Sequence, residues 1–431
     1  MNERGGVIVA GGGIGGLAVA LAVSHAGWDV RLFEQAAAFS EVGAGVQLGP
    51  NVVRVLHAWG LQAELARVAA FPGRLQVRDA LSGRELGVLP LGDQALRKYG
   101  APYLTLHRAD LHGALLHMLQ QRSNVELNLN HCVDSYAEQG RKINLRMIKS
   151  ECAGPAPGVE NSLQLMSPRL ERSVTVEGDV LIGADGLWSR VRELMLGDGP
   201  PRVTGHLAYR ALIAQASLPE SLRSQQVTAW LGPKLHVVQY PVRGGEFLNV
   251  VAIVQGHARC DLQSWDHSAN AADLLAATRL TAAPLREMIQ AVTESGSKRA
   301  PAWRLWSMCD RPPMTGARQQ AQGRVALLGD AAHPMRPYLA QGAGMAIEDA
   351  AELGAALALA SNLAFDLPTA LQRYAKNRWR RNAKVQARAQ RNGQIFHAEG
   401  PLRWARDASL RLLGEKVLDL PWLYGQGPRK V

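Results

Sequence analysis

Apolar and polar positions alternate along the chain in a way that predicts recurring units of strand, turn and helix. In the first unit, "GVIVA" predicts an apolar strand, "LAVALAVSHA" has helical spacing, and "DVRLFE" predicts a second strand that ends in an acid. Similar units follow at "DVLIGADGLWSRVR" and at "RVALLGDAAHPMRPYLAQGAGMAIEDA". Three such units in separated parts of the chain predict a Rossmann-like nucleotide-binding α/β domain built from discontinuous pieces.

The segments between these units carry a different pattern. "QVTAWLG", "LHVVQYPVR" and "FLNVVAIVQG" predict successive antiparallel strands. The expected division assigns residues 1–75, 100–190 and 295–370 to the nucleotide-binding domain, 76–99 and 191–294 to an inserted β-sheet substrate domain, and 371–431 to a helical C-terminal region. Residues 153–172 are rich in Gly, Pro and Ser, which predicts a long surface hairpin or a flexible insert.

The first turn carries a GxGxxG motif at Gly11, Gly13 and Gly16. The first glycine permits a tight turn, the second lets the backbone approach a pyrophosphate, and the third lets helix and strand pack closely. Glu34 ends the next strand, where a carboxylate accepts hydrogen bonds from ribose hydroxyls. A structural glycine turn is the alternative, but strand, helix and acid are all in register. An acid at this position disfavours a 2′-phosphate, so the expected dinucleotide is FAD or NAD.

Acidic residues follow the strands of the other two units. Asp185 and Gly186 end one strand, and Gly329 and Asp330 directly follow "VALL". A carboxylate at a strand end can bind sugar or ribityl hydroxyls. From the pattern alone, a helix N-cap is an equally good interpretation of Asp330.

Net charge changes the picture in one segment. The chain of 431 residues has a formal charge of +11, and residues 373–391 contain eight Lys or Arg and no acid. The segment is interpreted as a solvated helix face or as a patch that attracts a phosphate-bearing cofactor or an acidic aromatic substrate. Nucleic acid is not expected as a partner, because no nucleic-acid-binding motif accompanies the charge.

Composition also argues against a metal site and a membrane segment. The four cysteines are far apart and form no CxxC pair, so neither a metal site nor a disulfide framework is expected. No apolar run reaches the ~20 residues that a membrane span needs. The start of the chain does not have the pattern of a signal peptide, so a cytoplasmic protein is expected.

These motifs together resemble the class A flavoprotein aromatic hydroxylases, above all the salicylate hydroxylases and 3-hydroxybenzoate 6-hydroxylases. The shared elements are GxGxxG with Glu34, "GAGVQLGPN", "HRADL", "GADGLWSRVR", "WSMCDRPP", "GDAAHPMRPYLAQGAGMAIEDA" and "WLYG", from residue 7 to about 425. The resemblance implies a glutathione-reductase-type FAD domain, NADH or NADPH as a transient co-substrate, and oxygen transfer through a flavin C4a-hydroperoxide to a hydroxylated aromatic acid. It also implies a monomer or homodimer.

The resemblance assigns roles to individual residues. Arg108 would lie against FAD, Asp185 would influence both FAD and NAD(P)H, Asp330 would bind the ribityl chain, and Pro334 would approach the reactive face of the flavin. Backbone amides at Gly342–Met345 would face flavin N1 and the C2 carbonyl, where a helix start also supplies positive partial charge. The implied cofactor-binding set is Gly11, Gly13, Ile14, Gly15, Gly16, Glu34, Gln35, Gly45, Val46, Arg108, Asp185, Asp330, Pro334, Gly342, Ala343, Gly344 and Met345.

The candidate substrate-binding residues lie on an expected strand in the β-rich part of the chain. His236 and Tyr240 are four apart on an expected strand, so both side chains point to one face. A half-buried structural histidine and an ordinary sheet tyrosine are the alternative. The 3-hydroxybenzoate 6-hydroxylases have His and Tyr at matching positions and a Gln that matches Gln341, which implies a catalytic set of His236, Tyr240 and Gln341. Arg210 is a candidate counterion for a carboxylate, with a structural role as the alternative.

Two positions depart from the resembling families. Gln239 replaces a second histidine that many relatives have, which suggests a different pocket polarity, and Gln47 stands where hydroxynicotinate hydroxylases have a catalytic histidine. The functional alternatives are an FAD-dependent dehydrogenase or reductase, a hydroxylase of a heteroaromatic acid, and a non-catalytic flavin sensor. The sequence does not distinguish 3-hydroxybenzoate from salicylate, or NADH from NADPH.

Overall fold

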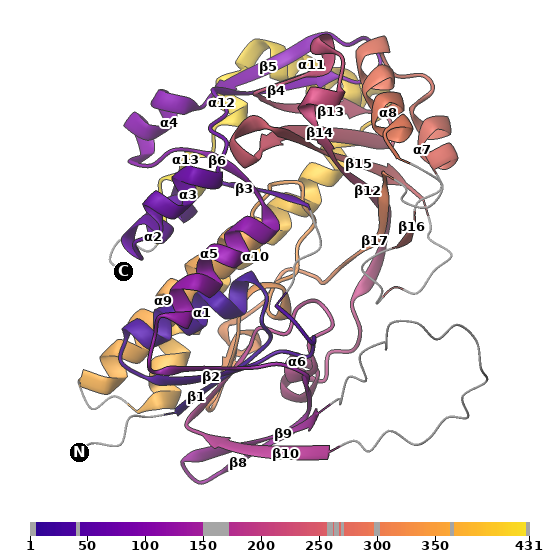
Figure 1. Cartoon of the computed structure of the whole chain (residues 1–431). Coiled ribbons are helices and arrows are strands. Elements are labelled where there is room, and N and C mark those ends of the chain that lie inside the picture. Colours follow the sequence, from indigo (N-terminus) through magenta and orange to yellow (C-terminus); the bar gives the residue numbers. More distant parts are fainter. Residues whose placement is uncertain are drawn as a thin grey trace, which may run out of the picture.

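The computed structural model places two sheets and their helices around one long C-terminal helix (Figure 1). The structure describes residues 6–39, 44–149, 172–256, 262, 267–268, 271–296, 302–362 and 366–427. The predicted insert at 153–172, apart from Arg172, lies outside the described residues, as do two of the four cysteines, Cys152 and Cys260.

The lower sheet in Figure 1 has six strands in the order β18-β19-β11-β1-β2-β7. The strands are β1 Gly6–Ala10, β2 Asp29–Phe33, β7 Val125–Asn128, β11 Val180–Gly183, β18 Ala321–Gln322 and β19 Val325–Leu327. All neighbouring pairs are parallel except the antiparallel edge pair β18–β19. Each central strand is an apolar run, as expected for a parallel sheet that is covered on both faces.

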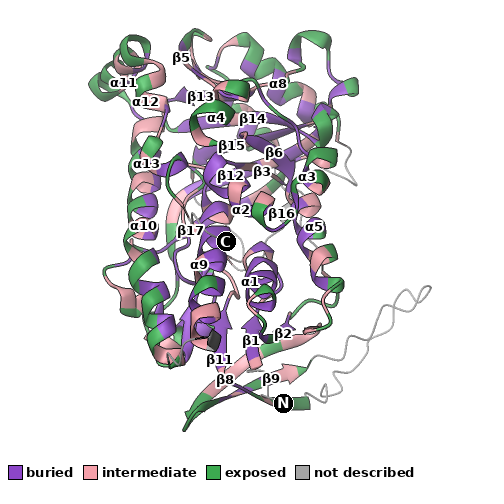
Figure 2. Ribbon diagram, turned by 90° about the vertical axis from the view of Figure 1, so that its left-hand side faces the viewer, coloured by how far each residue is buried: buried purple, intermediate pink, exposed green. Residues whose placement is uncertain are grey.

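Helices cover one face of this sheet and a small second sheet covers the other. The helices are α1 Ile14–His25, α5 Arg108–Gln120 and α9 Gly342–Asn362, and they share one apolar core with β1. The second sheet consists of β8 His131–Gln139, β9 Lys142–Lys149 and β10 Arg172–Gly178 in the order β10-β9-β8. Its Ile143 and Leu145 pack against Ile8 on β1. Figure 2 shows that the residues where these layers meet are mostly buried.

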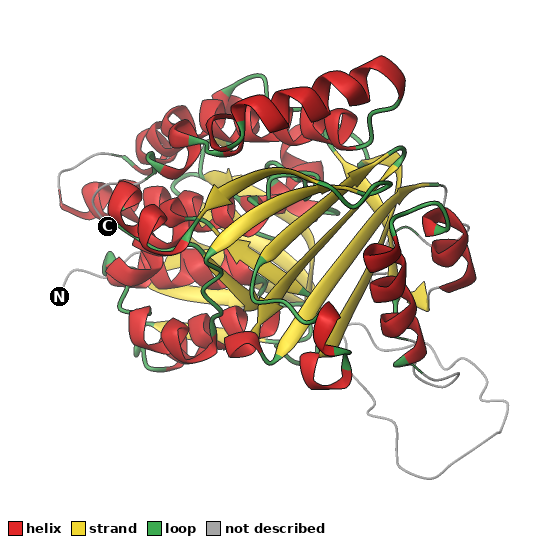
Figure 3. Ribbon diagram, turned by 90° about the horizontal axis from the view of Figure 1, so that it is seen from above, coloured by secondary structure: helices red, strands yellow, loops and turns green. Residues whose placement is uncertain are grey.

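The upper sheet is larger, twisted and mainly antiparallel (Figure 3). Its order is β16-β17-β12-β15-β14-β13-β4-β5. The strands are β4 Arg74–Asp79, β5 Glu85–Pro90, β12 Arg202–Ala214, β13 Val227–Gly232, β14 Leu235–Val242, β15 Phe247–Gln255, β16 His267–Ser268 and β17 Arg304–Asp310. The helices α7 Ala271–Thr278 and α8 Ala283–Glu294 pack on one face. The other face looks toward the six-stranded sheet and the C-terminal helices.

Two further elements join the sheets. A two-stranded ribbon, β3 Gly45–Leu48 with β6 Leu104–His107, lies between them, and the Thr105 hydroxyl donates to the carbonyl of Pro241 on β14 at 2.5 Å. The helix α10, Leu367–Phe396, runs from one sheet to the other (Figure 1). The remaining helices are α2 Pro50–Ala58, α3 Gln62–Val68, α4 Gly92–Tyr99, α6 Arg190–Leu196, α11 Gly400–Leu413, α12 Glu415–Leu418 and α13 Pro421–Tyr424.

The expected fold class is confirmed, whereas the division into domains stays a prediction. One strand lies across an expected boundary, because β17 was placed in the nucleotide-binding domain but pairs with β12 in the larger sheet. The expected β-rich block also contains the two helices α7 and α8. Among the described residues, no helix is long and apolar enough to cross a membrane. The same residues contain no cluster of His, Cys, Asp or Glu that could hold a metal ion.

Candidate active site

The first glycine turn is packed so tightly that side chains would not fit. A Cβ on Gly11 would lie 2.4 Å from the carbonyl oxygen of Ala184, and a Cβ on Gly16 would lie 1.9 Å from that of Gly11. The Glu34 carboxylate lies over the same turn, where Oε2 accepts from the Gly12 N–H at 2.6 Å. Gly11 has φ +105°, a conformation that favours glycine. The turn therefore presents backbone N–H groups and a carboxylate at the start of α1.

The residues next to the three motif glycines are also placed by close packing around this turn. Ile14 is buried in the core, and Gly15 faces Leu328, whose side chain would lie 3.0 Å from an added Cβ. Gln35 is exposed directly after β2. Gly13 begins α1 in an extended conformation and offers no side-chain cap, so the first N–H groups of α1 are left for a ligand.

The second acidic turn holds Asp185 through internal hydrogen bonds. Its carboxylate accepts from the Ser189 hydroxyl at 2.6 Å and from the Val191 N–H at 3.0 Å. Burial raises the pKa of Asp185, and these hydrogen bonds oppose that shift. Ala184 and Asp185 lie directly against Gly11, so this acidic turn packs against the glycine turn.

The third turn is anchored by a buried carboxylate on α9. Oδ2 of Asp349 lies 2.5 Å from Nε2 of His333 and 3.4 Å from the Gly329 nitrogen. Oδ1 accepts from Arg378 at 2.7 Å and from Asn382 at 2.9 Å, both on α10. Burial alone would raise the pKa of Asp349, but His333 and Arg378 outweigh it and lower the pKa to about 2. Because the carboxylate is ionised, Nε2 of His333 is the donor.

This anchoring leaves the turn's own acid pointing outward. Asp330 is exposed, although Gly329 and Ala331 on either side are buried. The helix N-cap interpretation is wrong for Asp330, since α9 begins only at Gly342. Pro334 is buried, and its carbonyl accepts from Gln386 on α10 at 3.1 Å.

The start of α9 combines free N–H groups with a constrained glutamine. The Gln341 carbonyl accepts from the Met345 N–H at 2.8 Å, so Gly342, Ala343 and Gly344 form the open first turn. A Cβ on Gly344 would lie 2.8 Å from Val52. The preceding residue, Ala340, has φ +52°, which is strained for a residue other than glycine. The positive end of this 21-residue helix therefore lies directly after the loop that contains Pro334.

Gln341 is oriented by a buried hydrogen-bonding chain. Nδ2 of Asn51 on α2 lies 3.2 Å from Oε1 of Gln341 and 2.7 Å from Oε1 of Glu348. Glu348 is buried and accepts from Arg378 and Arg381 at 2.7 Å each, and these cations lower its pKa against the effect of burial. Because the side-chain oxygen Oε1 of Gln341 accepts from Asn51, the side-chain NH₂ group of Gln341 is the part left to contact a ligand.

The ribbon β3–β6 brings the flavin-motif segments against the larger sheet. The Gly45 N–H donates to Oδ1 of Asn249 at 2.7 Å, and the Arg108 N–H donates to the Ala44 carbonyl at 2.8 Å. A Cβ on Gly45 would lie 2.5 Å from the ring of Tyr240. Gly45, Val46 and Arg108 are thus next to the strand expected to bind substrate.

The two residues expected to contact substrate, His236 and Tyr240, lie on one face of β14. His236 and Tyr240 are buried, and the His236 ring centroid is 4.9 Å from that of Tyr338, in the loop between Pro334 and Gln341. Tyr240 shares an apolar cluster with Leu339 of the same loop. Gln239 points to the opposite face, toward Thr228 and Val250, because side chains alternate along a strand. The expectation that Gln239 changes the polarity of this pocket is therefore wrong.

Arg210 lies on the same face of the sheet, two strands away. It pairs in register with Val251, which pairs with Val238, between His236 and Tyr240. Its guanidinium lies over the Trp306 ring at 4.5 Å. Burial and the charge of Arg108 lower the pKa of Arg210 to about 10, so it stays cationic at neutral pH. In the described part of the chain it forms no ion pair with an acid.

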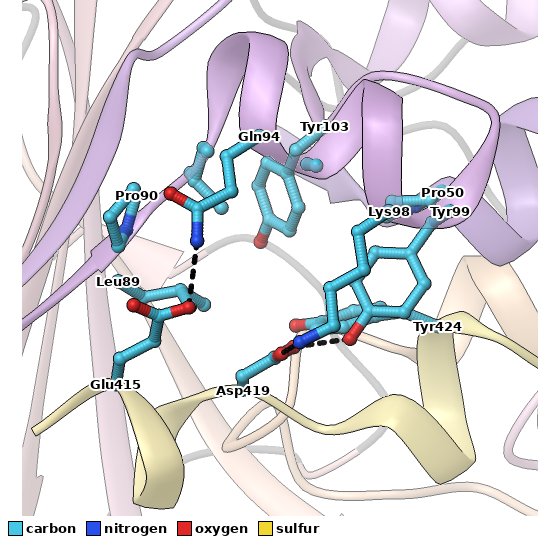
Figure 4. A pocket seen from close by; sticks show the side chains of 12 residues that line it. Pro50, Leu89, Pro90, Gln94, Lys98, Tyr99, Tyr103, Glu415, Asp419 and Tyr424 are labelled. Carbon is cyan, nitrogen blue, oxygen red and sulfur yellow. Dashed lines mark hydrogen bonds and ion pairs between the residues drawn. The ribbon is translucent and has the colours of Figure 1, made fainter.

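Figure 4 shows a small apolar pocket lined by Tyr103 and Tyr424, which share an apolar cluster with Tyr240. Tyr103, one of its lining residues, donates to Oε1 of Gln47 at 2.8 Å. Asp419 accepts from Tyr99 at 2.6 Å at the pocket rim. The lining residues are Pro50, Leu89, Pro90, Leu91, Gln94, Ala95, Lys98, Tyr99, Tyr103, Glu415, Asp419 and Tyr424. Through the ring of Tyr424, which packs edge-on against Tyr103, the C-terminal "WLYG" segment contacts the residue that hydrogen-bonds Gln47.

The basic segment 373–391 has two kinds of cation. Arg378 is buried and Arg381 partly buried, and both pair with the acids of α9. Five others are exposed: Arg373, Lys376, Arg380, Lys384 and Arg391. The solvated-face interpretation therefore holds for most of the segment, while two arginines have a structural role that the charge pattern did not indicate.

The residues present fit FAD. The two glycine positions leave no room for a Cβ, the Glu34 carboxylate is aimed at the turn, and exposed Asp330 lies between buried neighbours. These features, together with the layered α/β domain and its attached eight-stranded sheet, define an FAD-binding flavoprotein. The residues that would hold FAD are the glycine turn, Glu34, Arg108, Asp330, Pro334 and the first turn of α9.

Comparisons with known proteins also indicate an FAD-binding flavoprotein. The chain belongs to the FAD binding domain family, which matches residues 4–389. It is 35% identical over 429 residues to the 3-hydroxybenzoate 6-hydroxylase of Polaromonas naphthalenivorans (strain CJ2), covering 97% of this chain and 95% of that one. It is 33% identical over 404 residues to the 6-hydroxynicotinate 3-monooxygenase of Bordetella bronchiseptica, covering 93% and 94%.

A solved structure has the same fold. Klebsiella pneumoniae HpxO, solved with FAD and uric acid, superposes with a TM-score of 0.78 at 25% identity, covering 97% of this chain and 95% of that one. The chain is an FAD-dependent aromatic-ring monooxygenase. The alternatives of a reductase and of a non-catalytic sensor gain no support from these relatives.

Several residues of the site were missed by sequence reasoning. Asn51, Asp349, Arg378 and His397 come from separate elements, and their contacts depend on tertiary packing. One signal was available: the acids of "IEDA" interrupt an apolar helix, where buried charges require partners.

Proposed function

We propose that this enzyme hydroxylates a small aromatic acid that carries a phenol, of the 3-hydroxybenzoate or salicylate type, with NADH or NADPH and O₂. The supporting observation is the shared sheet face of His236, Arg210 and Tyr240, which looks onto the loop from Pro334 to Gln341. The relatives named above act on related rings. His236, Tyr240 and Gln341 are proposed as the catalytic set.

Arg210 is suited to bind the substrate carboxylate. It is cationic and partly buried, and it forms no ion pair with an acid of the described chain. A carboxylate that enters this site compensates the guanidinium and forms charge-assisted hydrogen bonds with it. The register places Arg210 beside the midpoint between His236 and Tyr240, so a ring held by its carboxylate lies along β14.

His236 is suited to accept the phenol hydrogen. Burial, followed by His397 and His206, lowers its pKa well below the usual range, so the ring is neutral and keeps one lone pair. Electrophilic attack ortho or para to a phenol oxygen makes the O–H strongly acidic as the new bond forms. A weak base at hydrogen-bonding distance is therefore sufficient in the transition state.

Gln341 and Tyr240 complete the contacts with the ring substituents. The NH₂ group of Gln341 donates to the phenol oxygen, where negative charge develops as the proton leaves. Burial raises the pKa of Tyr240 well above its usual range, so its hydroxyl stays protonated and remains a donor. FAD, when bound, would supply the redox chemistry that activates oxygen for transfer to the ring. The N-terminus of α9 would stabilise negative charge on the flavin.

The test is a substrate panel with the purified FAD-loaded enzyme. 3-Hydroxybenzoate, salicylate, 6-hydroxynicotinate and benzoate are compared by NADH and NADPH oxidation, oxygen uptake and product mass. A phenolic acid is expected to stimulate oxidation and to gain one oxygen atom from ¹⁸O₂. NADH consumption with no labelled product for any member of the panel would refute the proposal.

The role of His236 has a separate test. His236→Ala is expected to retain FAD and to lose at least about a hundredfold in kcat for the active substrate, the lower range for general acid–base groups. Gln239→Ala is the matched control, because Gln239 lies on the same strand but on the far face. Equal turnover in His236→Ala and wild type would remove His236 from the mechanism.

A further inference from the structure

Three histidines from distant parts of the chain meet beside the proposed substrate site. They are His206 on β12, His236 on β14 and His397, which directly follows α10. All three side chains are buried, and the centroids of the His206 and His397 rings are 4.9 Å apart. The ring of Tyr338 packs beside them, and its hydroxyl lies 2.6 Å from Nδ1 of His206.

His236 and His397 contact each other through ring nitrogens. Nδ1 of His236 lies 2.7 Å from Nε2 of His397, a hydrogen-bonding distance. The backbone fixes His397 in place, because its carbonyl accepts from the Lys234 N–H at 3.2 Å, in the turn just before β14. Within the described residues, Nε2 of His236 has no hydrogen-bond partner, so it is available to a ligand.

Both rings are neutral in the ligand-free protein. Burial, followed by repulsion from His206, Arg336 and Arg406, lowers the pKa of His397 to about 3. The pKa of His236 is lowered for similar reasons. Two neutral imidazoles share one hydrogen in their contact, so one ring donates and the other accepts.

This sharing links His397 to the face that His236 presents to substrate. If Nδ1 of His236 donates to His397, Nε2 of His236 has a lone pair and accepts from a phenol. If Nε2 of His397 donates instead, Nε2 of His236 carries a hydrogen and donates to a phenolate. His397 can serve in both arrangements, because a neutral imidazole nitrogen can either accept or donate.

We propose that His397 is a positioning residue for the hydroxylation: its Nε2 accepts from Nδ1 of His236 and so holds the His236 ring with the Nε2 lone pair toward the phenol, and when the phenol proton moves to Nε2 of His236 the resulting imidazolium keeps this hydrogen bond to neutral His397. This inference rests on the proposed function, because it assigns the phenol to His236. It explains why a buried histidine stands at the end of α10 opposite β14. His397 itself does not contact the substrate.

Two variants separate positioning from packing. His397→Phe retains a ring but has no nitrogen, and His397→Gln places an amide near the position of Nε2 that can accept or donate. Dissociation constants of 3-hydroxybenzoate, salicylate and benzoate are measured for each FAD-loaded protein by flavin absorbance under anaerobic conditions. Benzoate lacks the phenol and reports on binding that does not involve His236.

His397→Phe is expected to weaken binding of the phenolic acid about tenfold, the loss of roughly one hydrogen bond, with benzoate binding and FAD content unchanged. His397→Gln is expected to restore most of the difference. An unchanged ratio of phenolic-acid to benzoate affinity in His397→Phe, or equal defects in the two variants, would overturn the proposal. A wild type that binds neither phenolic acid more tightly than benzoate would instead overturn the proposed function.

A substrate-independent measurement tests the contact itself. In protein labelled with [¹⁵N]histidine, the ring nitrogens of His236 are assigned by comparison with His236→Asn. The wild type is expected to show one dominant His236 tautomer, and His397→Phe a changed tautomer population. Identical His236 signals in the two proteins would refute the positioning role whatever the substrate is.

Discussion

Replacing Arg378 by methionine removes the cation that neutralises two carboxylates at the centre of the molecule. The Arg378 side chain is almost fully buried and donates to Asp349 and Glu348 at 2.7 Å each. Methionine fills a similar volume but carries no charge. After the change, Glu348 retains Arg381, and Asp349 retains His333. The two acids are then partly uncompensated in a medium where charge is costly.

The expected loss follows from the geometry. Removing one partner of a buried ion pair costs about 3–5 kcal/mol, and the remaining partners place this case near the lower end. At roughly 2.1 cal/mol/K per residue, unfolding 431 residues has an entropy of about 0.9 kcal/mol/K. A cost of about 3–4 kcal/mol should therefore lower the melting temperature by about 3–4 °C.

The assay is thermal unfolding followed by circular dichroism at a fixed excess of FAD, since ligand binding shifts apparent stability. Arg373→Met is the matched control, because Arg373 is on the same helix but exposed. Its expected shift is below about 1 °C, as for most surface substitutions. If Arg378→Met melts at the temperature of Arg373→Met, the buried carboxylates do not depend on this cation and the reasoning is refuted.

Three further predictions follow from the site. The folded protein lowers the pKa of Asp349 from 3.8 to about 2, so the ionised carboxylate contributes roughly 2 kcal/mol of stability above pH 4. This contribution should be lost between about pH 4 and 2, which is measured as a fall in the midpoint denaturant concentration. Gly45→Ala places a Cβ 2.5 Å from the Tyr240 ring, so it should cost about 1–3 kcal/mol of stability and weaken substrate binding. Gly113→Ala is the control, because no neighbouring atom lies within 4 Å of its added Cβ. Equal melting curves for the two variants would contradict the clash. Asp330→Ala should weaken FAD binding at least about tenfold in a fluorescence titration of apoprotein while the fold is retained, and unchanged affinity would remove Asp330 from the FAD site.

Much of the proposed flavin site could be read from sequence because its chemistry is local. The glycine turn, Glu34, the two acidic turns and the start of α9 each occupy a few consecutive residues, and their roles follow from backbone geometry and helix ends. The shared face of His236 and Tyr240 was equally accessible, since a strand repeats every two residues. The same rule applied to Gln239 would have placed it on the far face.

Other features depended on tertiary packing. The sequence showed a basic helix and two acids, but not that Arg378 reaches Asp349 or that this carboxylate anchors the turn of Asp330. It assigned residues 295–370 to the nucleotide-binding domain, and did not show that β17 within them pairs with β12 in the larger sheet. His397 is 161 residues from His236, and only the return of α10 across both sheets brings the two rings to 2.7 Å. Local pattern determined which groups can bind FAD, whereas long-range packing decided which buried charges and ring nitrogens are paired, because pairing depends on distances that no local sequence window contains.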